Sequence, residues 1–180
     1  KEVQQLLPDT FEILSLKDIN CVEEIPETGD TLEENAKIKA DYVTQTFGLD
    51  CFSDDTGLLV DALNGAPGVY SARYAGGQKS ASDNMEKLLS ELKSATDRSA
   101  HFKTVVHLNL NGESYMFEGI VEGQITTEMH GEGGFGYDPI FKPNGYDNTF
   151  GELPSAVKNA ISHRGRAIEK LVEFLKKKAQ

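Results

Sequence analysis

Two long runs rich in apolar residues flank Asn111-Gly112 in the stretch HFKTVVHLNL-NG-ESYMFEGIVEGQI, residues 101–125. Such runs, with many β-branched and aromatic residues, are typical of strands. An Asn-Gly pair between them favours a two-residue hairpin turn, because both residues tolerate positive φ. The sequence therefore predicts a hairpin with strands at 101–110 and 113–125.

Alternating helices and strands surround this hairpin. Apolar residues recur at spacings of three and four from Leu32 to Phe47, and Gly48 comes next, which predicts a helix that ends there. The other predicted helices are 2–7, 82–92, 156–161 and 166–178, and the other predicted strands are 11–16, 49–53 with an apolar continuation at 58–63, and 139–141. We expect the α/β class, with a central mixed β-sheet and flanking helices, because a hairpin interrupts the alternation.

Length and charge narrow the possible functions. The chain has 180 residues and a formal net charge of -11, which fits one domain, or two lobes that share a core. An acidic chain repels nucleic-acid backbones, so we expect no nucleic-acid partner. No run approaches the roughly 18 apolar residues of a membrane span, and we expect no membrane partner. A polyanionic nucleotide could still bind where a divalent cation and a few basic side chains line one cleft.

The two cysteines, Cys21 and Cys51, have none of the Cys or His neighbours of a zinc site. Two cysteines in a chain of this length indicate reduced thiols that serve packing. We therefore expect a cytoplasmic protein.

Asp54-Asp55-Thr56-Gly57 has two interpretations. It can form a solvated turn, in which Asp55 caps the next segment and Gly57 takes a positive φ. Alternatively it can provide a Mg²⁺ site, since Mg²⁺ binds through one or two carboxylates plus phosphate oxygens, with one carboxylate acting as a general base. A strand would point the two carboxylates to opposite faces.

Glu34 is open to a similar pair of interpretations. Thr31-Leu32-Glu33-Glu34 fits a capping box, in which the fourth residue bonds back to the helix start. A carboxylate in a first helical turn is also well placed to hold a metal in a neighbouring cleft. We expect Glu33 to be solvated.

Several basic and Gly-rich segments have plain structural alternatives. Lys39 and Arg73 can be surface cations, and Ser162 in Ser162-His163-Arg164-Gly165 can be a helix cap. Residues 131–138 combine glycines with Phe135 and Tyr137, which suits the close approach and stacking of a flat ligand. No GxGxxG or Walker motif supports a common nucleotide-binding fold.

Together, these segments closely resemble the inosine/xanthosine triphosphate pyrophosphatase family. The resemblance runs in order over nearly the whole chain. It rests on Thr31 to Ala40 with its Glu34-Asn35-Ala36 core, Ser53 to Leu58, Gly65 to Tyr74, Gly133 to Pro139 and Ile161 to Gly165.

The resemblance implies a role for each matching residue. Asp55 corresponds to the catalytic acceptor and, with Glu34, to a ligand of Mg²⁺, while Asp54 lies beside them in the catalytic group. Lys39 and Arg73 match basic residues near the phosphates, and residues 135–138 match the loop that receives the base. The implied substrate-binding residues are Thr56, Lys39, Arg73, Phe135, Gly136, Tyr137, Asp138, Lys158, His163 and Arg164.

The family also implies an activity and an architecture. Its members hydrolyse non-standard purine nucleoside triphosphates such as ITP, dITP and XTP to the monophosphate and pyrophosphate. They are usually homodimers with an elongated cleft between two lobes. The family opens with a strand and a Thr/Ser-x-Asn-x-x-Lys phosphate loop, which we expect upstream of residue 1.

Rival functions are a septum-related pyrophosphatase for other modified nucleotides and a nucleotide-binding sensor without turnover. The Ser162-His163-Arg164 segment argues against the first. A haloacid-dehalogenase phosphatase needs Asp-x-Asp, and the adjacent Asp54-Asp55 pair has the wrong spacing.

Overall fold

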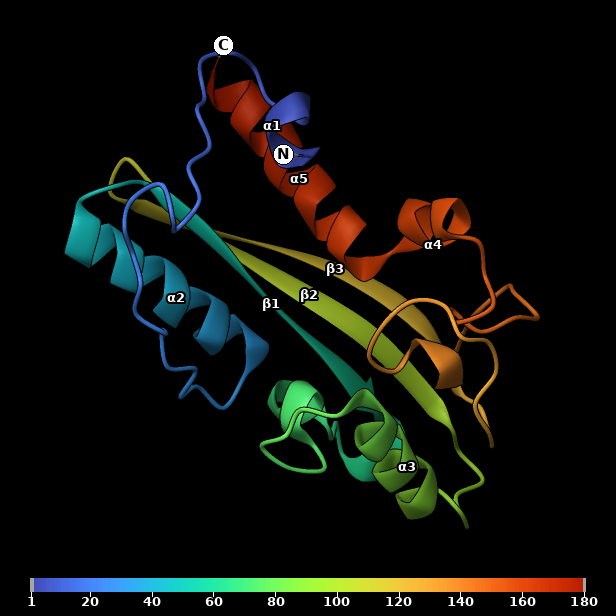
Figure 1. The fold of residues 1–180 in the computed structure, drawn as a ribbon. Helices are drawn as coiled ribbons and strands as arrows, with labels where there is room; N and C mark the ends of the chain where they lie inside the picture. Colours follow the sequence, from blue (N-terminus) through green and yellow to red (C-terminus); the bar gives the residue numbers. More distant parts are fainter. Residues whose placement is uncertain (1, 180) are drawn as a thin grey trace.

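A four-stranded antiparallel sheet forms the centre of the protein in a computed structural model that describes residues 2–179 (Figure 1). The strands succeed each other in the order of the chain. They are β1 (Cys51–Val60), β2 (Ser99–Leu110), β3 (Glu113–Ile125) and β4 (Phe141–Pro143). The predicted α/β class is confirmed, although the strands pair antiparallel throughout these residues, where a mixed sheet was expected.

The predicted hairpin is confirmed. Asn111 and Gly112 both have positive φ, 52° and 79°, as a tight turn between twisted strands requires. Leu110 pairs with Glu113 directly beside the turn. Because β2 and β3 are long, the register that this turn sets extends from Leu110 and Glu113 to Ser99 and Gln124.

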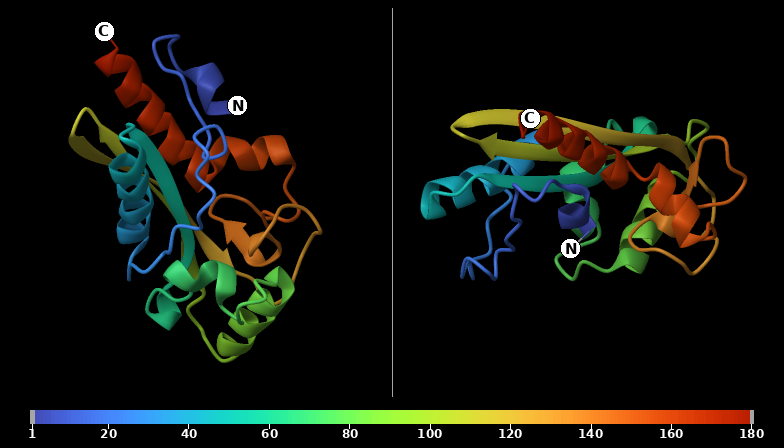
Figure 2. Two further views of the ribbon diagram at one scale, coloured as in Figure 1. Left: turned by 60° about the vertical axis from the view of Figure 1, so that its left-hand side comes forward. Right: turned by 90° about the horizontal axis from the view of Figure 1, so that it is seen from above.

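Helices cover both faces of the sheet. α2 (Leu32–Phe47) lies on β1 and β2, and α5 (His163–Lys178) lies on β2 and β3 from the opposite side (Figures 1 and 2). The remaining helices are α1 (Glu2–Leu6), α3 (Ala81–Glu91), α4 (Ser155–Ile161), and the 3₁₀ helices η1 (Asp61–Leu63), η2 (Gly68–Arg73) and η3 (Asp138–Ile140). None of the helices within residues 2–179 has the length and apolar character of a membrane span.

Alternation along β2 decides which helix each side chain meets. Val105 packs against Leu32 and Ala36 of α2. The next residue, Val106, packs in the cluster that contains Leu171 of α5. Both valines are fully buried, because neighbouring side chains of a strand leave opposite faces and each face carries a helix.

A second core lies at the other end of the sheet. Phe102, Phe141 and Phe150 form an aromatic cluster there, with ring centroids of Phe102 and Phe141 4.6 Å apart. Leu88 of α3 is fully buried in the same cluster. This core holds α3 and residues 137–150 against the sheet.

The strand predicted at 11–16 is wrong. The amide side chain of Gln4 bonds to this segment instead, donating to the carbonyl of Phe11 (2.8 Å) and accepting from the N–H of Ile13 (2.6 Å). A side chain thus satisfies backbone groups that a neighbouring strand would otherwise pair. The alternating apolar residues are nevertheless partly buried, because Phe11 and Ile13 pack against the cluster that contains Leu171 of α5.

Two other segments differ from their predicted form. Residues 49–53 and 58–63 belong largely to one strand, β1, which runs unbroken through Asp54-Asp55. The strand predicted at 139–141 is a 3₁₀ turn over residues 138–140 that leads into β4. The division into two lobes stays a prediction.

Replacing Leu88 by Ala should lower the free energy of unfolding by about 2–5 kcal/mol, the range for buried leucines. Leu14, which is 50% exposed, provides the matched control, and its replacement by Ala should change stability by less than about 0.5 kcal/mol. Urea titration followed by circular dichroism measures both values. Equal losses in the two variants would contradict the assignment of the second core to α3.

Candidate active site

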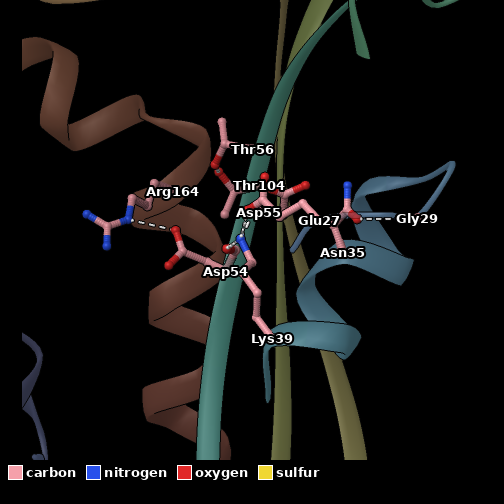
Figure 3. A network of polar contacts seen from close by, with 9 residues as sticks. All are labelled: Glu27, Gly29, Asn35, Lys39, Asp54, Asp55, Thr56, Thr104 and Arg164. Atoms are coloured by element: carbon pink, nitrogen blue, oxygen red, sulfur yellow. Dashed lines mark hydrogen bonds and ion pairs between the residues drawn. The ribbon is translucent and has the colours of Figure 1, made fainter. Parts of the chain in front are cut away.

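Asp54 and Asp55 lie in the middle of β1, on opposite faces of the sheet (Figure 3). The turn interpretation is therefore wrong. Gly57 is needed for a different reason, since a Cβ atom there would lie only 2.6 Å from the carbonyl oxygen of Gly68. Gly57 thus allows the η2 segment to lie against β1.

Three oxygen atoms surround the ammonium group of Lys39 on the α2 side of β1. Lys39 Nζ lies 2.7 Å from Glu27 Oε1, 2.6 Å from the carbonyl oxygen of Asp54 and 3.2 Å from Asp55 Oδ1. The Asp55 side chain is only 13% exposed. The structure therefore brings predicted residues from α2 and β1 together, and adds Glu27 to them.

Burial and charge set the ionisation of this cluster. Burial raises the pKa of the Asp55 carboxyl, and the Lys39 ammonium limits that rise while the Glu27 charge adds to it. For Lys39, burial acts to lower the pKa, but the bonds to Glu27 and the charge of Asp55 outweigh it, so the pKa lies above its usual value. Lys39 therefore stays cationic at neutral pH.

Asn35 lies on the same side of β1 as Asp55 (Figure 3) and is 1% exposed. Its Oδ1 accepts a hydrogen bond from the N–H of Gly29 (2.8 Å). Its Nδ2 is buried and makes no hydrogen bond of standard geometry within residues 2–179, yet Asn35 is near enough to lower the pKa of Asp55 slightly. Asn35 thus holds the segment before α2 and lies beside Asp55 of β1.

Glu34 forms hydrogen bonds at the N-terminus of α2. Thr31 caps the helix by accepting from the N–H of Glu34 (3.1 Å), and Glu34 Oε2 accepts from the N–H of Asp30 (2.7 Å). The predicted cap by Thr31 is therefore confirmed. The Glu34 carboxylate bonds to the backbone of Asp30, whereas a capping box would bond it to the backbone of Thr31. Glu33, expected to be solvated, forms an ion pair with Lys103.

On the other face of β1, Arg164 donates from Nε to Asp54 Oδ2 at 3.1 Å. Ser162 caps α5 by accepting from the N–H of Gly165 (3.0 Å), which places Arg164 in the first turn of that helix. The two terminal nitrogens of Arg164 point away from Asp54 (Figure 3). The structural role expected for Ser162 is thus confirmed.

His163 is 6% exposed and stacks on Phe102, with ring centroids 4.8 Å apart and planes at 14°. Its Nδ1 is buried without a hydrogen-bond partner among the described residues. Burial lowers the pKa of His163 to about 4, and the nearby Lys158 and Arg164 charges act in the same direction. The imidazole is therefore neutral at pH 7.

Residues 131–138 are joined to α4 by an ion pair between Asp138 and Lys158. Asp138 Oδ2 also accepts from the N–H of Phe135 (2.8 Å). The Phe135 ring is 75% exposed, with Lys158 Nζ 4.4 Å from its centroid. Gly136 has a φ of 59°, which suits glycine at this bend. The loop thus presents an aromatic face beside a cation.

The remaining predicted residues have local contacts. Tyr137 is 5% exposed and donates to the carbonyl of Ser71 (2.8 Å), which ties the loop to η2.

Thr56 shares a hydrogen bond with Thr104 of β2 (2.7 Å). The guanidinium of Arg73 lies 5.1 Å from the ring centroid of Tyr70, and no described contact joins it to Lys39 or Asp55.

Comparison with known proteins defines the family. A sequence model of the Ham1 family matches residues 1–174. The chain belongs to the Ham1 family.

Two relatives of this Ham1 protein are dITP/XTP pyrophosphatases, and a third has a closely similar structure. It is 62% identical to a dITP/XTP pyrophosphatase of Flavobacterium johnsoniae, over 97% of this chain and 91% of that one. It is 48% identical to a dITP/XTP pyrophosphatase of Bacillus subtilis, over 97% and 90%. The structure of the Staphylococcus aureus Ham1 protein superposes with a TM-score of 0.94 at 40% identity, covering 98% of this chain and 92% of that chain. The resemblance expected from sequence is confirmed.

Sequence reasoning missed several residues of this Ham1 protein's site. Glu27 lies in an ordinary Pro-Glu-Thr-Gly turn, and only its ion pair with Lys39 distinguishes it. Thr104 and Phe102 resemble any other strand residues, and their contacts with Thr56 and His163 depend on strand pairing and helix packing. Asn35 belongs to the Glu34-Asn35-Ala36 core of the resemblance. Its polar side chain at a position next to Glu34 was the feature that could have identified it.

The depressed pKa of His163 predicts a pH-dependent stability. At pH 7.5 the residue is almost entirely neutral in both the folded and the unfolded state, so it contributes almost nothing. As the pH falls from 6.5 towards 4, the unfolded chain binds a proton that the folded protein does not, and stability should fall by about 2–3 kcal/mol at pH 4.5. Urea unfolding of wild type and His163→Phe at pH 7.5 and 4.5 tests this. The variant should lose less stability on acidification, and an unchanged loss would contradict the prediction.

Proposed function

We propose that this protein hydrolyses the non-standard purine nucleotides ITP, dITP and XTP to the nucleoside monophosphate and pyrophosphate, and so removes them from the nucleotide pool. The observation that carries the proposal is the partly buried Asp55 carboxylate held against Lys39, on the strand that contains the family motif. The dITP/XTP pyrophosphatases that resemble this chain over nearly its whole length support the choice of substrate.

Local charge reconciles an acidic protein with a polyanionic substrate. The chain has a net charge of -11, but we propose that Lys39, Lys158 and Arg164 provide positive charge where the substrate binds. Lys158 forms an ion pair with Asp138, and Arg164 forms one with Asp54, so each cation is oriented before substrate binds. We propose that Lys39 and Arg73 bind phosphate oxygens.

We propose Mg²⁺ as the cofactor, with Asp55 and Glu34 as its protein ligands. No group of three or more His, Cys, Asp or Glu side chains suited to a metal occurs within residues 2–179. Mg²⁺ does not need one, since one or two carboxylates plus substrate phosphates suffice. The oxygens of Glu27, Asp54 and Asp55 around the Lys39 ammonium are hard donors of the kind that Mg²⁺ prefers. When bound, Mg²⁺ supplies charge neutralisation of the phosphates.

Asp55 is proposed as the proton acceptor. A water molecule attacks at the α–β linkage, one of its protons passes to the Asp55 carboxylate, and pyrophosphate leaves. Asp54 contributes from the other face of β1 by holding Arg164. We propose that Thr56, next in the strand, contacts the substrate.

Base recognition is proposed for the opposite face of β1. Phe135 offers an exposed ring for stacking, and residues 136–138 complete the loop that receives the base. A hydrogen-bond donor from Arg164, His163 or the loop backbone would pair with the 6-keto group of inosine or xanthine. It would leave the 6-amino group of adenine unmatched, a buried mismatch worth about 1–3 kcal/mol. We further propose that the enzyme is a cytoplasmic homodimer.

Replacing Asp55 by Asn should lower kcat for ITP by roughly 10²- to 10⁴-fold, because the amide cannot accept the proton. The matched control is Asp61→Asn, an exposed carboxyl just beyond the same strand, and its kcat should stay within about twofold of wild type. Pyrophosphate release coupled to inorganic pyrophosphatase measures both. Normal turnover by Asp55→Asn would eliminate Asp55 as the acceptor.

Wild-type protein with Mg²⁺ should release pyrophosphate from ITP, dITP and XTP, and far more slowly from ATP or GTP. Removal of the metal with EDTA should abolish release, and added Mg²⁺ should restore it. Binding of ITP without release would instead indicate a nucleotide sensor. A preference for other modified nucleotides would favour the septum-related activity.

A further inference from the structure

We propose that Gly119 of β3 is a positioning residue for base recognition. It sets how closely the first turn of α5 approaches the sheet, and thereby places His163 and Arg164. This inference rests on the proposed function, because it takes those two residues as contacts of the base. Gly119 would thereby affect specificity without being one of the proposed substrate or metal contacts.

The backbone of α5 leaves no room for a side chain at Gly119. A Cβ atom at Gly119 would collide with the carbonyl oxygen of His163, and would lie 2.6 Å from the backbone nitrogen of Ala167 and 2.9 Å from the Cβ of Arg166. Real Cβ atoms do not lie within 3.0 Å of such backbone atoms. The first turn of α5 therefore rests on the backbone of β3 at this one position.

Two cations hold the helix on either side of that contact. Arg166 Nη1 donates to the carbonyl of Ile120 (2.6 Å), and Lys170 Nζ donates to the carbonyl of Glu118 (2.7 Å). β4 pairs only with residues 123–125 of β3, so these two carbonyls lie on an edge that no other strand of the described chain covers. Gly119 sets the depth of α5, and the two cations set its register along the strand.

His163 and Arg164, the proposed base contacts, both lie in the first turn of α5, so their positions depend on how that turn packs on β3. His163 stacks on Phe102 of β2, which pairs with Val121, two residues beyond Gly119. Arg164 reaches across the sheet to Asp54 at 3.1 Å. Because both residues come directly after the Ser162 cap, any shift of the helix start moves the imidazole and the guanidinium together.

The proposed hydrolytic centre should be less affected by such a shift, because α5 contacts Asp54, whose side chain lies on the opposite face of β1 from Asp55. Asp55 and Lys39 lie on the α2 side of the sheet, whereas α5 packs on the other. Displacement of α5 should therefore weaken substrate binding and base discrimination while leaving the hydrolytic step largely intact. A purely structural role would lower the folded fraction and leave the KM of the remaining enzyme unchanged.

Gly119→Ala tests the inference, with Gly77→Ala as the matched control. A Cβ at Gly77 meets nothing within 4 Å, so this control makes the same chemical change without a collision. We expect Gly119→Ala to raise the KM for dITP and XTP at least about tenfold, to change kcat less than about threefold, and to reduce the preference for dITP over dATP. Gly77→Ala should match wild type. A folded Gly119→Ala with wild-type KM and preference would overturn the inference, as would a fall in kcat alone.

A second variant covers the case in which Gly119→Ala does not fold. Arg166→Met combined with Lys170→Met removes both bonds to the β3 edge but keeps side-chain length, and should raise KM in the same direction by a smaller factor. Unchanged KM in this double variant would also overturn the inference. If wild-type protein releases no pyrophosphate from dITP or XTP, the proposed function itself fails, which is a separate outcome.

Discussion

An extended strand sends neighbouring side chains to opposite faces, and the site depends on this constraint. Asp54 and Asp55 are adjacent in β1, so one carboxylate meets Arg164 of α5 while the other meets Lys39 of α2. One dipeptide thereby connects the two helices that cover the sheet. The proposed hydrolytic centre and the proposed base contacts can be close in space and still be held by different layers of the protein.

Close backbone contacts keep those layers in place. Gly57 lets the η2 segment lie against β1, and Gly119 lets α5 lie against β3. Apolar contacts between the same elements, such as Val105 with Ala36 and Val106 with Leu171, stabilise the arrangement. Asp54, Asp55, Lys39 and Arg164 are therefore carried by packed helices and a strand, which suits groups that must be oriented before substrate binds.

Charge is organised locally in a strongly acidic chain. Lys39 stays cationic despite partial burial because Glu27 and Asp55 lie beside it, whereas His163 stays neutral because it is buried next to Lys158 and Arg164. The two faces of β1 thus differ in character. One offers carboxylates with a cation, and the other offers an aromatic stack with an imidazole nitrogen that has no hydrogen-bond partner within residues 2–179.

The sequence by itself determined the hairpin and the helix that Thr31 caps and Gly48 ends, because periodicity, caps and turn residues act over a few neighbouring positions. It also determined the family, because the motifs are long and occur in order along the chain. It predicted the strand at 11–16 wrongly, since strand formation needs a partner and the side chain of Gln4 bonds there instead. Only the tertiary structure decided that Glu27 joins Lys39 and Asp55, that Phe102 lies under His163, and that α5 rests on β3. Such contacts join residues far apart in the chain, and they depend on how the helices pack on the sheet.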